Sequence, residues 1–248
     1  MGERFFKFSL LEKFPLICGV STRNYGDMRF GQLPDEEVIK NRQQFCQSLK
    51  INLDDLVVAK LVHGSKITTV AKEEKGRGVR DLASAIDQTD GLITKEKGVY
   101  LMVTVADCFP IFVYDPIREI VGLVHAGWRG IIAQIVDNLL GKLKNLGSDP
   151  RDLIFALGPG ICQKHFIVKK AVLQKFQEYY PSATLVRNHD GYVDLRKAIL
   201  FDLKKGAVAA DNIEVAGDCP ACLNGLYGSF RKEGAAVPAS AAIIGMRE

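Results

Sequence analysis

The chain has 248 residues, of which 47% are hydrophobic and 25% are charged, and its formal net charge at pH 7 is only +4. This composition is typical of a globular protein with a sizeable core, and so small a positive surplus argues against binding of nucleic acid through many phosphate contacts. Because no run of eighteen apolar residues occurs, the sequence predicts no membrane span.

Six cysteines are present, but nothing at the start of the sequence predicts export. The N-terminal residues lack the long apolar segment of a signal peptide, and Phe6 stands where myristoylation of Gly2 would require Ser or Thr. A core of this size needs no covalent cross-links. We therefore predict reduced thiols in a cytoplasmic protein.

Hydrophobic periodicity predicts alternating helices and strands. Apolar residues at three- and four-residue spacing favour helices, whereas short runs rich in Val, Ile and Thr favour strands. In chain order, the pattern predicts a helix over 35–49, strands over 57–62, 67–71, 91–94, 99–105, 111–114 and 120–124, and helices over 131–146, 169–180 and 195–210, the last with Asp194 as its N-cap. With no repeat or linker, we expect one α/β domain over 1–248 containing a mixed sheet or two packed sheets.

Three segments each end a predicted strand with a side chain of the metal-ligand type. They are LVHGS around His63, ADCFP around Cys108 and VHAGWRG around His125. Two imidazoles and one thiolate with an open fourth position form the arrangement of a catalytic zinc site. The alternative is that each side chain is simply packed, the usual state of a lone His or Cys at a strand end. Three such segments in a chain with only four histidines weigh against that alternative, and the residues alone leave both interpretations open.

Several motifs, in order, give the chain a resemblance to a known family. VHGSKI, DQTDGLIT, TVADCFPIFVYDP, VGLVHAGWRGI and LGPGI occur in that order, and GVSTRN and SFRKEG lie nearer the two ends. Together they resemble the YfiH-like laccase-domain family, formerly described as polyphenol oxidases and now as purine nucleoside phosphorylases. Two loops, residues 23–29 and 166–169, depart from the usual family pattern. Since such loops would line the substrate pocket, the departure bears on which substrate is preferred more than on which reaction is catalysed.

The resemblance implies a fold, a metal and a set of substrates. The implied fold is a layered α/β/β/α sandwich with mixed sheets, and the implied metal ligands are His63, Cys108 and His125. Zinc is the implied metal, with copper as the alternative. The implied reactions are phosphorolysis of adenosine, inosine, guanosine and S-methyl-5'-thioadenosine, together with deamination of adenosine, so the expected partners are purine nucleosides and phosphate.

The chemistry of these reactions points to further residues. Zinc would acidify a bound water, as deamination requires, but no His is followed by Glu at the second position, so the zinc nucleobase-deaminase signature is absent. We predict Asp107 as the proton shuttle, with ligand orientation or turn capping as its alternative role. Phosphate requires cations, and Arg129 and Arg23 are the predicted substrate-binding residues; for each the alternative is a solvated surface charge.

Competing functions use the same side chains. A metal-free hydrolase would use Cys108 as nucleophile and His125 as base, but it leaves His63 without a purpose. A copper-dependent polyphenol oxidase is a third interpretation, although four histidines cannot also supply a trinuclear copper cluster. A non-enzymatic metal-binding protein is the fourth.

The remaining cysteines leave one further question open. Cys219 and Cys222 are spaced Cys-x₂-Cys, and Cys162 and His165 are spaced Cys-x₂-His. These spacings permit a second, closed zinc site. The sequence alone favours a reduced pair of loop thiols.

Overall fold

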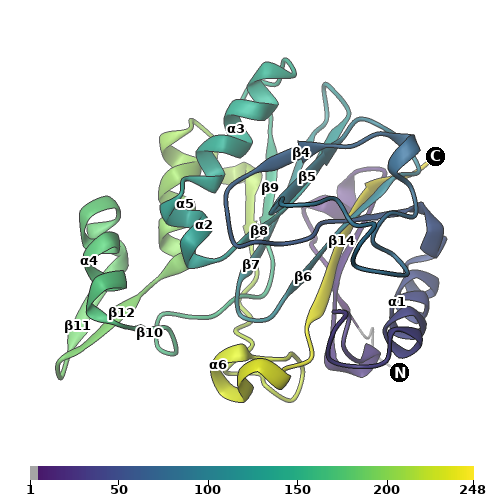
Figure 1. Ribbon diagram of the computed structural model, residues 1–248. Helices are drawn as coiled ribbons and strands as arrows, with labels where there is room; N and C mark the ends of the chain where they lie inside the picture. Colours follow the sequence, from purple (N-terminus) through teal and green to yellow (C-terminus); the bar gives the residue numbers. More distant parts are fainter. Residues whose placement is uncertain (1–4) are drawn as a thin grey trace.

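The computed structural model describes residues 5–248 and contains two mixed β-sheets that pack face to face, with helices on their outer faces (Figure 1). Gly2, on which the myristoylation argument rested, lies outside the described residues. The predicted layered α/β architecture with mixed sheets is confirmed.

The five-stranded sheet is covered on its outer face by helix α1 (Asp35–Leu49), which has the predicted bounds. Phe45 and Leu49 of α1 pack against Met102 and Ile243 of the sheet. Sequence reasoning identified only two of the sheet's strands. Its strand order is β1 (Phe5–Phe6), β2 (Leu16–Ser21), β14 (Ser240–Met246), β6 (Tyr100–Val105) and β3 (Leu56–Val58).

The six-stranded sheet lies between the five-stranded sheet and a layer of helices. Alternate residues of its central strands face opposite ways: Phe112 and Leu123 enter the core between the two sheets, whereas Ile111 and Val124 face the helices. Both faces are therefore buried, which explains the continuous apolar runs in the sequence. The strand order is β13 (Ile213–Val215), β9 (Ile154–Leu157), β7 (Phe109–Asp115), β8 (Ile120–Ala126), β5 (Gly91–Thr94) and β4 (Ile67–Thr69).

Helices α2 (Trp128–Ile132), α3 (Ile135–Asn145) and α5 (Leu195–Lys205) cover the outer face of this sheet (Figure 1). The prediction of one helix over 131–146 is wrong, because Gln134 adopts a left-handed conformation (φ 60°) that separates α2 from α3. The helix predicted over 195–210 is shorter and ends before Gly206. Its N-cap is confirmed, since the Asp194 carboxylate accepts the Lys197 N–H at 3.0 Å.

A smaller unit projects beside these helices. Strands β10 (Ile167–Val168), β12 (Asp190–Val193) and β11 (Thr184–Arg187) form a three-stranded antiparallel sheet against α4 (Lys170–Tyr179), which confirms the helix predicted over 169–180. The short helix α6 (Phe230–Glu233) lies nearer the C-terminus, just before β14.

A buried acid in α5 gives a prediction about stability. Tyr180 Oη donates to Asp202 Oδ2 at 2.8 Å and lies 3.2 Å from the carbonyl oxygen of Ile131. Burial raises the pKa of Asp202 from 3.8 to about 6, although the Tyr180 hydrogen bond acts in the opposite direction. A carboxyl whose folded pKa is raised favours folding below its unfolded pKa, and that contribution is lost as the pH rises through the folded pKa. We expect Asp202→Asn to raise the free energy of unfolding at pH 8 by on the order of 1 kcal/mol.

The same substitution should change stability much less at pH 4, where the wild-type carboxyl is already neutral. Urea unfolding at the two pH values measures the difference. Equal effects at both would contradict the assignment of a raised pKa to Asp202.

Candidate metal centre

Three segments meet at one end of the sandwich, because two of the connections cross between the sheets there. The turn from β6 to β7 passes from the five-stranded to the six-stranded sheet and carries Cys108, and the loop from β3 to β4 makes the same crossing and carries His63. His125 lies near the end of β8, on the same side of the strand as Leu123, and so faces the other sheet. The layered fold thereby brings together residues that are 62 positions apart.

The donor atoms of His63, Cys108 and His125 lie within 4.8 Å of one another. The two imidazole rings are perpendicular, with centroids 4.9 Å apart. Gly127 closes the group from behind, since a Cβ at that position would lie 2.9 Å from the Cys108 sulfur. A thiolate and two imidazoles at this spacing fit a zinc ion or another borderline metal.

Asp90 organises this cluster, and sequence reasoning did not assign it a role. Its Oδ1 lies 3.0 Å from His125 Nδ1, and its two carboxylate oxygens accept the backbone N–H groups of His63 at 2.8 Å and Gly64 at 2.7 Å. The carboxylate therefore holds His63 in its left-handed conformation (φ 58°) and leaves His125 Nε2 free for a metal. A carboxylate bonded to the distal nitrogen is the usual support of a metal-binding histidine. The DQTDGLIT motif, in which Asp90 immediately precedes β5, was the available signal in the sequence.

The two histidines of the cluster differ in the direction of their pKa shifts. Burial lowers the pKa of His63, and the nearby His125 adds to that effect. Burial would also lower the pKa of His125, but the Cys108 sulfur and the Asp90 carboxylate outweigh it and raise the pKa to about 9. Without a metal, the raised pKa therefore favours a protonated His125 imidazolium beside Asp90 and Cys108. A metal ion must displace that proton when it binds.

A cavity of about 620 Å³ opens over the cluster. Its lining combines the three donor side chains with aromatic rings and cations, among them Trp128, Phe166, Phe230, Arg29, Arg129 and Arg231. Both loops that depart from the family pattern contribute, through Arg29 and Phe166. Aromatic faces beside cations suit a ligand with a flat base and a phosphate.

Residues 17–247 match the family model described as multi-copper polyphenol oxidoreductase laccase. The chain belongs to this laccase-domain family. It is 30% identical to the purine nucleoside phosphorylase YlmD of Bacillus subtilis over 94% of this chain and 89% of that protein. It is 29% identical to the adenosine deaminase RL5 of an unknown prokaryotic organism, over 79% of this chain and 77% of that protein.

The crystal structure of YlmD from Geobacillus stearothermophilus has the same fold. It superposes with a TM-score of 0.95 at 27% identity, covering all of this chain and 98% of the other. No helix within residues 5–248 has the length and hydropathy that crossing a bilayer requires.

Asp107, the predicted proton shuttle of this laccase-domain protein, lines the cavity beside Cys108. Its two carboxylate oxygens accept the Ser229 hydroxyl at 2.8 Å and the Arg231 N–H at 2.6 Å, so it also holds the start of α6 against the site. Burial raises the pKa of Asp107, although both hydrogen bonds act against that shift. The geometry is compatible with proton transfer and with turn capping.

The two predicted substrate-binding arginines lie in different surroundings. Arg129 lines the cavity, its guanidinium stacks 4.6 Å from the Trp128 ring, and no carboxylate among residues 5–248 pairs with it. Arg23 is absent from the cavity lining, and its guanidinium is paired with Glu233 at 2.6 Å. A role of Arg23 in substrate binding stays a prediction.

Arg29 is a cation that sequence reasoning missed. One of its terminal nitrogens donates to the carbonyl oxygens of Ala235 and Val237, while its buried Nε has no hydrogen-bond partner among the described residues. An unpaired buried donor in a cavity wall is costly unless a ligand accepts from it.

Proposed function

We propose that the protein is a zinc-dependent purine nucleoside phosphorylase that also deaminates adenosine. The observation that carries the proposal is the convergence of His63, Cys108 and His125 beneath a cavity with aromatic faces. The cavity also offers Arg129, which no carboxylate of residues 5–248 pairs with. The proposed substrates are adenosine, inosine, guanosine and S-methyl-5'-thioadenosine, with inorganic phosphate as co-substrate. Relatives named purine nucleoside phosphorylase and adenosine deaminase support both activities.

His63, Cys108 and His125 would hold the metal, and Asp90 would fix the orientation of His125. Zinc suits this set because a thiolate and two neutral imidazoles leave the ion with a net positive charge. When bound, the ion would supply Lewis acidity toward the substrate. Copper binds the same donor types, so metal analysis has to test for both.

The side chains above the cluster would bind and orient the substrates. The purine is expected to stack on the aromatic lining, which includes Phe166 and Phe230, and Arg129 to bind phosphate through charge-assisted hydrogen bonds. In phosphorolysis a phosphate oxygen bonds to C1' of the ribose. The bond from C1' to the purine nitrogen breaks, and its electron pair leaves with the base. The products are the free base and ribose 1-phosphate.

Asp107 is the proposed proton carrier for deamination. It lies in the cavity wall, and its raised pKa allows a carboxyl to hold and release a proton closer to neutral pH. Deamination adds water across the amino-bearing carbon of adenine and releases ammonia, so a proton must reach the departing nitrogen. Asp107 is the carboxylate next in sequence to Cys108.

The test is product analysis of adenosine with and without phosphate. We expect adenine and ribose 1-phosphate only when phosphate is supplied. Ammonia should form in either condition, with inosine accumulating when phosphate is absent and being cleaved to hypoxanthine when phosphate is present. Arg129→Ala should raise the KM for phosphate about tenfold or more, since one charge-assisted hydrogen bond contributes roughly 1.5–3 kcal/mol. The KM for the nucleoside should change less.

Arg151→Ala is the matched control, because Arg151 is an exposed arginine paired with Asp149 away from the cavity. Free ribose forming equally fast without phosphate would replace the phosphorylase assignment with a hydrolase. Oxidation of a phenol by the copper-loaded protein, with no nucleoside cleavage, would favour the polyphenol oxidase alternative.

A further inference from the structure

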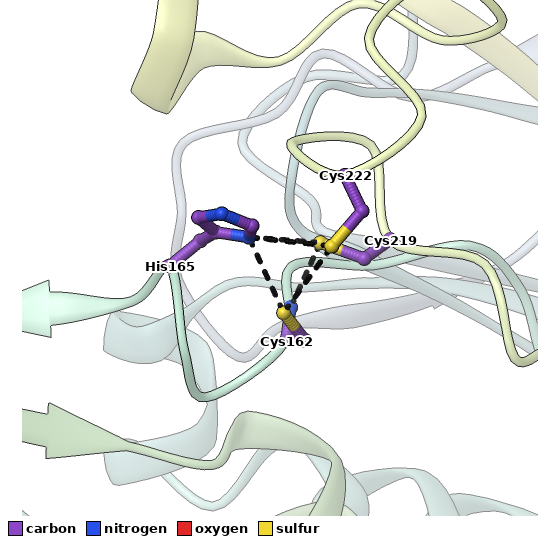
Figure 2. A group of neighbouring side chains, drawn as sticks. All are labelled: Cys162, His165, Cys219 and Cys222. Carbon is purple, nitrogen blue, oxygen red and sulfur yellow. Dashed lines mark hydrogen bonds between the residues drawn. The ribbon is translucent and has the colours of Figure 1, made fainter.

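A second cluster of soft ligands lies outside the catalytic cluster. Cys162, His165, Cys219 and Cys222 place three sulfur atoms around one imidazole nitrogen, and Figure 2 shows the four side chains converging. The Nδ1 atom of His165 lies 3.4 Å from the Cys162 sulfur, 3.8 Å from that of Cys219 and 3.5 Å from that of Cys222. The sulfurs of Cys162 and Cys222 are 3.9 Å apart.

The fold brings these residues together through two neighbouring strands. Strands β9 and β13 pair in parallel, so the segments that follow them start from the same edge of the sheet. The segment after β9 carries Cys162 and His165, and the segment after β13 carries Cys219 and Cys222.

Each pair of ligands sits on a tight turn. The His165 N–H donates to the Cys162 carbonyl oxygen at 3.0 Å, and the Cys222 N–H donates to the Cys219 carbonyl oxygen at 3.0 Å. The two turns thus have the same hydrogen bond, and their ligand side chains point toward each other. A backbone N–H, that of Cys162, also donates to the Cys219 sulfur at 3.2 Å, as a thiolate ligand accepts in a metal site.

Hydrogen bonding alone does not explain this convergence. A single imidazole nitrogen carries either one proton or one lone pair, so it can form one good hydrogen bond and not three. Nor does the cluster contain a disulfide: its three cysteines are free, as are the other three of the chain, and sulfur atoms 3.9 Å apart are not bonded.

The distances match those around a tetrahedral zinc ion. Zinc bonds of about 2.3 Å to sulfur and about 2.0–2.1 Å to nitrogen set sulfur–sulfur edges of about 3.8 Å and sulfur–nitrogen edges of about 3.6 Å. The four separations lie between 3.4 and 3.9 Å. The sequence alone favoured a reduced pair of loop thiols, and the geometry favours the alternative.

We propose that Cys162, His165, Cys219 and Cys222 bind a structural zinc ion, distinct from the metal at His63, Cys108 and His125. Four protein ligands leave no open position, so this ion would not bind substrate. The thiols lose their protons to solvent on binding, and no redox change is involved.

The position of the cluster suggests what the ion stabilises. Ile161 and Phe166, which flank the first turn, line the substrate cavity, and Arg231 donates to the His165 carbonyl oxygen at 3.0 Å. Gly160 N–H donates to Asp218 O at 3.3 Å, so backbone also links the two segments just before their ligands. The ion would lock one wall of the cavity by joining the two turns.

Metal analysis of full-length protein purified from zinc-supplemented cultures tests the proposal. We expect two zinc ions per chain in the wild type, one in Cys108→Ala, one in Cys222→Ser and none in the double variant. Cys18→Ser, outside both clusters, is the matched control and should keep two. Cys222→His, which restores a ligand atom, should recover the second ion.

Cobalt substitution gives a spectroscopic measurement that does not depend on activity. Cobalt-loaded Cys108→Ala should show intense thiolate-to-cobalt charge transfer and tetrahedral bands, and Cys222→Ser should lose most of that intensity. Cys108→Ala without bound metal would overturn the proposal, as would Cys222→Ser with the wild-type metal content. If Cys222→Ser fails to fold, the Cys108→Ala measurements decide.

The metal contents of the same variants distinguish this proposal from the proposed catalytic metal at His63, Cys108 and His125. One zinc in the wild type that Cys108→Ala keeps and Cys222→Ser loses would support the structural site and contradict the catalytic one. The reverse pattern would contradict the structural site alone.

Discussion

Cys108→Ala is expected to lose the catalytic metal ion and to lower phosphorolysis by more than about 100-fold, because residues that merely support a metal ligand already contribute about 10–100-fold. The fold should survive, since Cys108 is a half-buried turn residue outside the main apolar clusters. Metal analysis, circular dichroism and kcat/KM for inosine measure the three effects. Full metal content with full activity would show that the assignment is wrong.

His63→Ala then separates the metal enzyme from a cysteine hydrolase. As a metal ligand, His63 should matter for metal binding and activity together, whereas a Cys108–His125 pair should retain most of its activity without it. Chelator treatment is an independent measurement. It should abolish turnover, and added zinc should restore it. A verifiably metal-free protein that remains fully active would make Cys108 the nucleophile.

Asp90→Asn is expected to weaken metal binding by His63, Cys108 and His125 by roughly 10–100-fold and to lower activity accordingly. Asp90 is fully buried, and burial would raise its pKa, but bonds from His125 and the Gly64 N–H hold the pKa below its usual value. An amide presents one acceptor oxygen and one NH₂ group, so it cannot accept from His125 and both backbone groups at once. Competition with a chromophoric chelator measures the metal affinity.

Asp115→Asn is the matched control for that substitution. Asp115 is also buried and accepts backbone N–H groups, those of Ile117 and Arg118, but it lies in β7 at the end away from Cys108. Both variants are expected to lose some stability, and only Asp90→Asn should lose metal affinity. Equal losses of affinity would reduce Asp90 to a general structural role.

Local pattern was enough for some elements and not for others. The helix Asp35–Leu49 follows from its own periodicity, because one face packs on a sheet and the other meets solvent. The break at Gln134 does not, since the surrounding residues keep the spacing of a single helix. Strand β14 was missed although it lies between two strands, because its small residues, such as Ala241 and Ala242, carry little strand preference.

Some residues of the site could likewise be predicted from the sequence, and others could not. His63, Cys108 and His125 carry a chemical signal in their residue types, so sequence could nominate them. Asp90 carries none of its own, and its role depends on an imidazole 35 positions later that only the pairing of β5 with β8 brings near. Arg23 shows the converse: its place in a family motif suggested a ligand contact, and its contact with Glu233 depends on a segment about 210 residues away.

The two sheet-to-sheet crossings that carry His63 and Cys108 have a consequence for unfolding. A metal held by both crossings and by His125 of a central strand would act as a cross-link between two sheets whose shared core is apolar. The layers could not separate without releasing the ion. A ligand at 100 times its Kd adds about 2.7 kcal/mol to the free energy of unfolding. Resistance to heat would therefore track metal supply, and a metal-starved cell would lose the protein to proteolysis as well as losing its catalysis.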